Sequence, residues 1–276
     1  LSGADISGTG TLTTSAVTTI TNGVPGVGNG LGKPWVNTGT VNLAGDGQLF
    51  YYNAPSTFTN NGTFNLSSTQ ANPILVFNSS GHAFNNAGVF NKTQSGTQFI
   101  TNTNLAFNNT GTVNVTTGPL TINQTGTDTG TYNVPTGQSL TFNTAARSFN
   151  AGIAFTGTGS LNFTGSTQTF NTPMTFTASN PVVTLNGSTL NAPQNLSFTT
   201  GWNAQSGTIS GAGLLSTSGT TSVSNGVTIS GKTWDNTGTI NITGTSGRIT
   251  LSSTSTLNNN AGGVINYNGK IGRAHV

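Results

Sequence analysis

Four aspartates are the residues of this chain best suited to acid–base chemistry, and the sequence contains no glutamate. A typical glycosidase needs two carboxyl groups about 5 to 9.5 Å apart, one to donate a proton and one to act as base or nucleophile. The aspartates stand far apart in the sequence, at Asp5, Asp46, Asp128 and Asp235. A catalytic pair would therefore depend on the elements that bring two of them together.

Three other patterns invite a chemical interpretation. His82 has no second His, Cys or carboxylate close to it in sequence, so we interpret it as a turn residue rather than a metal ligand. The glycine-rich stretch NGVPGVGNGLGKP at 22–34 lacks the Gly-Lys-Ser/Thr ending and the following helix of a phosphate loop, which favours a surface loop. Calcium-binding β-roll repeats need an aspartate in every nonapeptide, and four cannot supply that. We expect no cofactor and no metal site.

The composition indicates a chain that forms strands throughout. Only 4% of the residues are charged, against about a quarter in average proteins. Single apolar residues alternate with Thr, Asn and Ser, which is the period of a half-buried strand. Without cysteine, no disulfide or cysteine-based metal site can form. No apolar run approaches the ~18 residues that span a bilayer, so we expect no membrane insertion within this segment.

The last seven residues, KIGRAHV at 270–276, depart from this composition. They resemble read-through of a common sequencing adapter, one frame of which encodes Ile-Gly-Arg-Ala-His-Val, and we exclude them from the fold. Without Lys270 and Arg273 the net charge falls from +3 to +1, so the basic balance gives no support for nucleic-acid binding. Because the chain begins at Leu1, we expect it to come from a longer protein that continues at both ends.

One motif recurs along the chain. The string FNNTGTVNV at 107–115 returns as WVNTGTVNL, FTNNGTFNL, FNNAGVFNK and WDNTGTINI. Alignment on the apolar residue that precedes Asn gives a mean period of about 25 residues, within the range of solenoid repeats. An aromatic residue often stands six positions before this anchor, which supports the register independently. The anchors are Val41, Phe64, Phe90, Val113, Tyr132, Leu161, Leu185, Ile209, Ile240 and Ile265.

A unit of short strands and turn glycines without a helical segment predicts an all-β fold. We expect one right-handed parallel β-helix, or β-solenoid, of about 10–11 coils with two or three strands per coil. Residues 35–269 would form the repeats, 1–34 an irregular N-terminal coil with the glycine-rich loop, and 270–276 the non-native tail. One interior column of the solenoid should be lined by Val41, Phe64, Phe90, Val113, Tyr132 and Leu161.

Two polar columns accompany the anchors. Asparagine is depleted in strands, but stacked coils would let each one bond to its copy in the next coil, as in an asparagine ladder. The predicted ladder is Asn42, Asn65, Asn91, Asn114, Asn133, Asn162, Asn186, Asn241 and Asn266. Glycine two residues before the anchor should supply a positive φ angle or a tight corner. These glycines are Gly39, Gly62, Gly88, Gly111, Gly130, Gly159, Gly207, Gly238 and Gly263.

The strings FNNTGTVNV and TGTGSLNFTG resemble repeats of bacterial surface β-solenoids, the filamentous-haemagglutinin-like and autotransporter-passenger adhesins, over about residues 8–269. The resemblance implies an exported, extracellular protein displayed at the bacterial cell surface. It also implies that this segment is a rigid stalk or adhesive shaft, whose partner is an unidentified host-surface, glycan or matrix ligand.

Two alternatives remain. Pectinase-like enzymes share the predicted architecture, but Asp46, Asp128 and Asp235 would lie four coils apart in turn, roughly 19 Å at ~4.8 Å per coil. That exceeds the reach of a carboxylate pair, so we expect no enzyme. An ice- or crystal-binding surface is the other alternative, because outward Thr and Asn would form columns ~6.6 Å apart along the strand and ~4.8 Å apart between coils.

Overall fold

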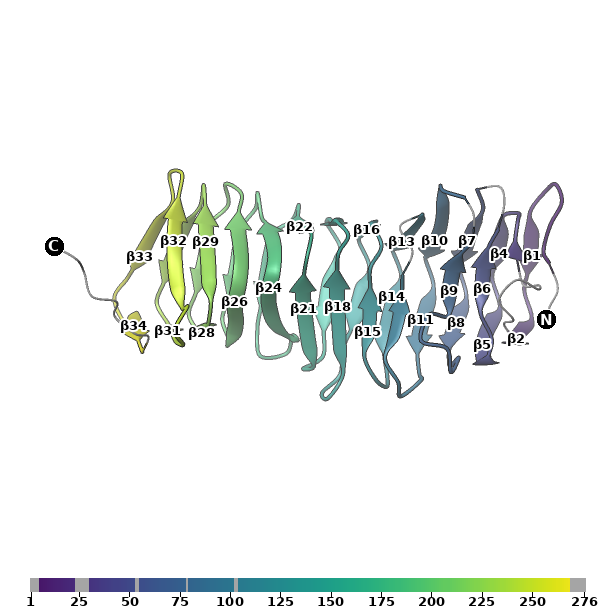
Figure 1. Ribbon diagram of the computed structural model, residues 1–276, viewed down its shortest axis with the longest axis horizontal. Helices are drawn as coiled ribbons and strands as arrows, with labels where there is room; N and C mark the ends of the chain where they lie inside the picture. The colour runs from purple at the N-terminus through teal and green to yellow at the C-terminus, as the bar shows by residue number, and fades with distance from the viewer. Residues whose placement is uncertain (1–4, 23–29, 53–54, 78, 102–103, 269–276) are drawn as a thin grey trace. The chain divides into compact units, whose positions relative to one another are not determined.

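The computed structural model describes residues 5–22, 30–52, 55–77, 79–101 and 104–268. Its described residues are all-β and contain no helix, and the parallel strands stack as a β-solenoid of about 11 turns with about 22 residues each. The chain divides into two units, Leu1–Ser160 and Leu161–Val276. Within each unit, Figure 1 shows the strands of successive coils lying side by side. The predicted β-solenoid is therefore confirmed.

Each full coil of the first unit has three strands, and equivalent strands stack into three faces. Face 1 consists of β1 (Leu12–Thr14), β4 (Trp35–Asn37), β7 (Thr57–Asn60), β10 (His82–Asn86), β13 (Leu105–Asn109), β16 (Gly126–Asp128) and β19 (Arg147–Phe149). Face 2 consists of β2 (Val17–Asn22), β5 (Thr40–Asp46), β8 (Thr63–Leu66), β11 (Val89–Lys92), β14 (Thr112–Val115), β17 (Thr131–Asn133) and β20 (Ala154–Thr156). Face 3 consists of β3 (Gly30–Leu31), β6 (Leu49–Tyr51), β9 (Ile74–Val76), β12 (Gln98–Ile100), β15 (Leu120–Ile122) and β18 (Ser139–Asn143).

The chain passes into the second unit through β21 (Ser160–Thr164). One sheet of this unit, the five-stranded sheet, contains β23 (Met174–Phe176), β25 (Leu196–Phe198), β27 (Leu215–Thr217), β30 (Thr233–Asn236) and β33 (Thr256–Asn259). The remaining strands are β22 (Thr167–Phe170), β24 (Val182–Asn191), β26 (Trp202–Ser210), β28 (Thr220–Val223), β29 (Gly226–Ser230), β31 (Thr239–Ile242), β32 (Arg248–Ser252) and β34 (Val264–Tyr267). The long strand β26 pairs with both β28 and β29, so it contributes to two faces.

Alternation along each strand builds the core. In β8, Phe64 and Leu66 are fully buried, while Thr63 and Asn65 point outward and are half-buried. Because the strands are parallel and in register, like side chains stack: the Phe64 and Phe90 ring centroids lie 5.3 Å apart, with 15° between the ring planes. Burial of one such side chain is worth about 1.5–3 kcal/mol, so repetition of the pattern supplies the stability that a charge-poor surface cannot.

The predicted interior column holds as far as Tyr132 and is wrong beyond it. Val41, Phe64, Phe90, Val113 and Tyr132 pair in succession, but the next partner of Tyr132 is Phe155, not Leu161. Leu161 is buried on a different strand, β21. The sequence motif could not reveal this change, because inward and outward residues alternate in the same way on every face.

Later anchors also change strand. Ile209 pairs with Ile229, whereas Ile240 pairs with Thr221 on one side and Ile265 on the other. The 31-residue interval between the anchors Ile209 and Ile240 therefore connects two different faces. Intervals of this kind made the predicted period, about 25 residues, longer than the observed one of about 22. Ile265 remains 41% exposed because no described coil stacks on β34.

Of the two roles expected for the corner glycines, a positive φ angle or a tight corner, the structure supports the tight corner at most of them. Of the nine, only Gly207 has a positive φ, at 122°. At Gly62, Gly88 and Gly111 an added Cβ would lie 2.1 Å from the carbonyl oxygen of the equivalent glycine one coil earlier. That carbonyl accepts the amide of the residue after the glycine, as from Thr63 to Gly39 at 2.8 Å. Glycine is needed because the backbones of successive corners approach too closely for any side chain.

The structure describes part of the predicted N-terminal segment, 1–34, and none of the predicted tail. The stretch 1–34 was expected to be irregular, but it contains β1 and β2, which pair in register with β4 and β5, and also β3. Most of the glycine-rich loop, residues 23–29, lies outside the described residues. The tail 270–276 also lies outside them.

Candidate functional site

The four aspartates that could do acid–base chemistry each have a different neighbour. Asp5 Oδ1 accepts the amide of Gly30 at 3.1 Å, and Asp46 Oδ1 accepts the Thr69 hydroxyl at 2.5 Å. Asp235 Oδ1 accepts the Asn258 amide at 2.8 Å. Among the described residues, no three His, Asp or Glu side chains gather where they could hold a metal ion.

Asp128 is fully buried and belongs to a charged cluster that sequence reasoning missed. Its Oδ1 accepts from the Tyr132 hydroxyl at 2.7 Å and from the backbone N–H of Asn109 at 3.2 Å. Arg147 Nε donates to Oδ2 at 2.9 Å, and Nη2 donates to Oδ1 at 2.7 Å. Burial, and then the Asp128 charge, hold the pKa of Tyr132 well above its ordinary value, so the phenol keeps its proton and donates it.

The environment of Arg147 explains how a charge can lie inside the solenoid. Its Nη1 donates to the Gln124 carbonyl and its Nη2 to the Phe107 carbonyl, both at 2.9 Å. The guanidinium lies 5.2 Å from the Phe142 ring centroid. An added Cβ on Gly126, its partner in register, would lie 2.8 Å from two guanidinium nitrogens. The cluster is enclosed and its groups satisfy one another, so its chemistry is structural. The sequence signal for this cluster was the spacing of Asp128 and Arg147, which carry opposite charges and lie about one coil apart.

His82 is not a turn residue, as the sequence had indicated, but the first residue of β10, with 2% exposure. Its Nδ1 accepts the Ser56 amide at 3.1 Å, so the ring proton is on Nε2, which donates to Ser79 Oγ at 2.6 Å. Burial lowers the pKa of His82, which favours this neutral form. Because Nε2 already carries the proton, the ring cannot take the proton of Ser79 as a catalytic base would.

Two buried lysines have lowered pKa values, a property shared with nucleophilic lysines. Lys92 Nζ donates to the carbonyls of Gln94, Gly96 and Thr117. Lys232 Nζ likewise donates to three carbonyls, those of Ala192, Gly211 and Gly213. Burial lowers the pKa of each lysine to about 8. Both ammonium groups donate to backbone oxygens of neighbouring segments, and these contacts tie the segments together.

An asparagine ladder inside the first unit was also missed. Asn37, Asn60, Asn86 and Asn109 are fully buried on face 1, and each of the first three donates Nδ2 to Oδ1 of the next at 2.8 Å. Asp128 pairs with Asn109 and takes the next position. The signal was the Asn that stands two residues after each aromatic, in WVN, FTN and FNN.

The predicted outer ladder is present on face 2. Asn65, Asn91, Asn114 and Asn133 each donate to the asparagine of the preceding coil at 2.8–3.2 Å, beginning at Asn42. Past Asn133 the partner is Thr156, not Asn162, for the reason given for Leu161.

In the second unit, the outer ladder is only partly as predicted. Asn266 donates to Asn241 at 2.9 Å, whereas Asn186 accepts from Ser206 at 2.9 Å. The outward column of the second unit is therefore not a continuous run of asparagines.

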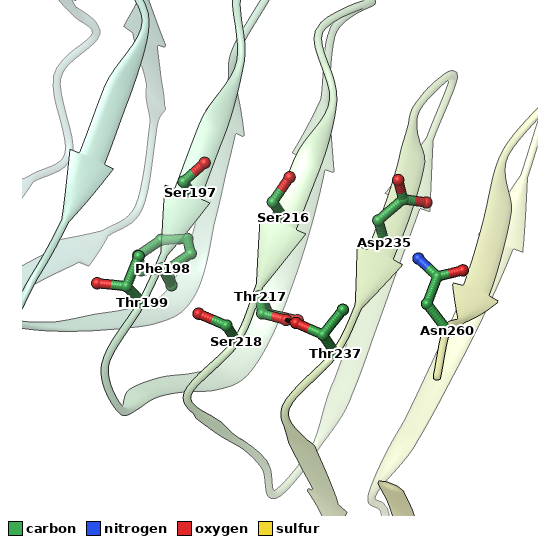
Figure 2. Close-up of a pocket in the computed structure, with 9 residues that line it drawn as sticks. All are labelled: Ser197, Phe198, Thr199, Ser216, Thr217, Ser218, Asp235, Thr237 and Asn260. Carbon is green, nitrogen blue, oxygen red and sulfur yellow. Dashed lines mark hydrogen bonds between the residues drawn. The ribbon is translucent and has the colours of Figure 1, made fainter. Parts of the chain in front are cut away.

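A shallow groove of about 280 Å³ lies on the outward side of the five-stranded sheet. Ser197, Ser216 and Asp235 occupy equivalent positions on β25, β27 and β30, at intervals of 19 residues. Figure 2 shows their oxygen atoms on the same side of the strands, with Asn260 beside Asp235. A second row, Thr199, Ser218 and Thr237, follows at the ends of these strands. Apart from Phe198, the lining consists of residues with hydroxyl groups, one amide and one carboxylate.

Stacked aromatic rings of the core lie beneath the groove. Phe198, whose neighbours Ser197 and Thr199 face outward, stacks on Trp202 with ring centroids 4.2 Å apart and planes 6° apart. Phe198 also stacks on Phe176 at 5.2 Å. Stacked rings under the sheet hold the outward side chains at fixed spacing, which pre-organises them for binding.

A search of the described residues finds no helix long and apolar enough to cross a membrane. Comparisons of the chain with protein-family models, curated proteins and solved structures returned no significant match.

Proposed function

We propose that this chain is a structural and adhesive segment, the stalk or shaft of an exported protein displayed at a bacterial cell surface, with no catalytic activity of its own. The observation that carries the proposal is the pairing of polar groups along the stack. Asparagine ladders and the backbone ladder run from coil to coil, as a stiff shaft requires. The chemically capable residues Asp128, His82, Lys92 and Lys232 are enclosed and occupied by contacts within the fold. The groove on the five-stranded sheet offers a place for a ligand of the adhesive partner classes: host surface, glycan or matrix.

The location can be tested on intact cells of the source bacterium. An antibody raised against this segment should label unbroken cells, and protease added outside should remove the label while a cytosolic marker survives. Labelling that appears only after lysis would contradict the proposal.

An ice- or crystal-binding surface is the second candidate, because face 2 carries an outward column of short polar side chains. The threonine column is not continuous: Val89 lies between Thr63 and Thr112. Its end positions are Val17, beside Thr40, and Ala154, beside Thr131. An ice-binding face needs a flat and unbroken array, so these gaps favour the stalk.

We therefore expect no thermal hysteresis and no shaping of ice crystals by the isolated chain. Thr112→Val combined with Thr131→Val should change the free energy of unfolding by less than about 0.5 kcal/mol per site, because both hydroxyls point outward. Nanolitre osmometry of the wild-type chain and the double variant measures the hysteresis, and urea titration measures the free energy of unfolding. Hysteresis in the wild-type chain that the double variant abolishes would establish the alternative.

A further inference from the structure

The groove on the five-stranded sheet combines a hollow with several polar groups that have no partner within the described residues. Within the described part of the chain, the side chains of Ser197, Ser216, Ser218 and Asn260 make no hydrogen bond. Asp235 uses only Oδ1, which accepts from Asn258, so Oδ2 is free of any protein donor there. A row of unsatisfied donors and acceptors thus lies beside the carboxylate (Figure 2).

The outer ladder of the first unit provides the contrast. On face 2, the side-chain amides of Asn65, Asn91 and Asn114 each donate to the asparagine of the preceding coil, so fewer of their polar atoms are available to a ligand. Ser197 and Ser216 are too short to span the ~4.8 Å between neighbouring strands, so stacking alone does not satisfy them. The same short side chains create the hollow of about 280 Å³.

The chemistry of the lining selects the class of ligand. No lysine, arginine or histidine lines the groove, and Asp235 would repel an anion. Calcium prefers six to eight oxygen ligands, usually with several carboxylates, and Asp235 is the one carboxylate in the lining. Hydroxyls that both donate and accept, next to a carboxylate that accepts, match a ligand rich in hydroxyl groups.

We infer that the groove binds a neutral saccharide, with two adjacent hydroxyl groups of one sugar ring donating to Asp235 and with Ser197, Ser216 and Asn260 completing the hydrogen bonds. This inference rests on the proposed adhesive function and names the chemical class of its ligand. The groove is open and its lining has no exposed aromatic ring, so one site should bind in the millimolar range. Repeated display of the segment would raise the avidity.

Saturation-transfer NMR on the full chain tests the assignment, with methyl α-D-mannopyranoside and methyl β-D-galactopyranoside as separate probes. We expect ring-proton signals from at least one glycoside in the presence of EDTA. In Asp235→Asn, which keeps the shape of the side chain, that signal should weaken at least tenfold, since the charge is lost and one accepting oxygen becomes an NH2 group that donates. Asp46→Asn is the matched control, because the Asp46 carboxylate also accepts from one neighbouring side chain, that of Thr69, and it should leave the signal unchanged.

Absence of signal from both glycosides with the wild-type chain would overturn the inference, as would equal signals from wild type and Asp235→Asn. Loss of the signal in EDTA would also overturn it, because a bound cation would then make the contact assigned to the carboxylate. Circular dichroism and thermal melting of each variant confirm that it is folded. Failure here leaves surface display intact, and failure of surface labelling on cells leaves saccharide binding intact, so the two proposals can be separated.

Discussion

Arg147→Met should lower the free energy of unfolding by about 3–5 kcal/mol, because it leaves the fully buried Asp128 carboxylate without its partner. The Tyr132 hydroxyl and the Asn109 backbone amide would then be the remaining donors to a charge that has lost three contacts from Arg147. Urea titration followed by circular dichroism measures the change. The exposed Arg248→Met is the matched control and should shift the value by less than about 0.5 kcal/mol.

The double variant Asp128→Asn with Arg147→Met separates charge from packing. Asparagine is the residue at the four preceding positions of the buried column, so it should extend the ladder from Asn109 without a charge. We expect the double variant to be more stable than Arg147→Met alone by about 2 kcal/mol or more, since no buried charge remains unpaired. A double variant that is less stable than the single one would show that the lost volume, rather than the charge, dominates.

Val113→Asp should be the other severe change, at several kcal/mol, because it places an unpaired charge among the side chains of Phe90 and Tyr132. Val113 is fully buried. Thr112→Asp introduces the same charge one residue earlier on the outward side, and it should cost less than about 1 kcal/mol. Denaturant midpoints of the two variants decide between the inward and outward assignments.

Asn114→Ala should cost about 1 kcal/mol or less, although it removes a member of the outer ladder. Asn91 and Asn133 each lose one hydrogen bond, and both side chains are only half-buried, so they can turn to water. Equal destabilisation by Asn114→Ala and Val113→Asp would refute the distinction between a core column and a surface column.

The sequence carries enough information for the coil itself. Alternation in TVNV and TFNL fixes which side chains point inward, and recurrence of the aromatic and asparagine positions fixes the register from Val41 to Tyr132. These features follow from local periodicity, which needs no knowledge of distant contacts. The outer ladder from Asn42 to Asn133 could therefore be predicted in full.

The position of Leu161 and the formation of the groove depend on how many residues each corner contains, and the local sequence pattern does not predict that number. The replacement of Leu161 by Phe155 beside Tyr132 follows from such a change in coil length. The groove arises in the same way, because two coils of 19 residues bring Ser197, Ser216 and Asp235 into one row. Its free hydroxyls became apparent only once their neighbours were known.

The buried charges were decided by tertiary structure alone. Asp128 has the same residue type as Asp46 and Asp235, yet it lies inside the coil because its position continues the buried asparagine column and Arg147 reaches it over Gly126. The glycine corners follow the same principle: recurrence marked the positions, but only the approach of one corner carbonyl to the next shows why a side chain is excluded. Periodicity determines what repeats along a chain, whereas stacking determines which of the repeated residues meet.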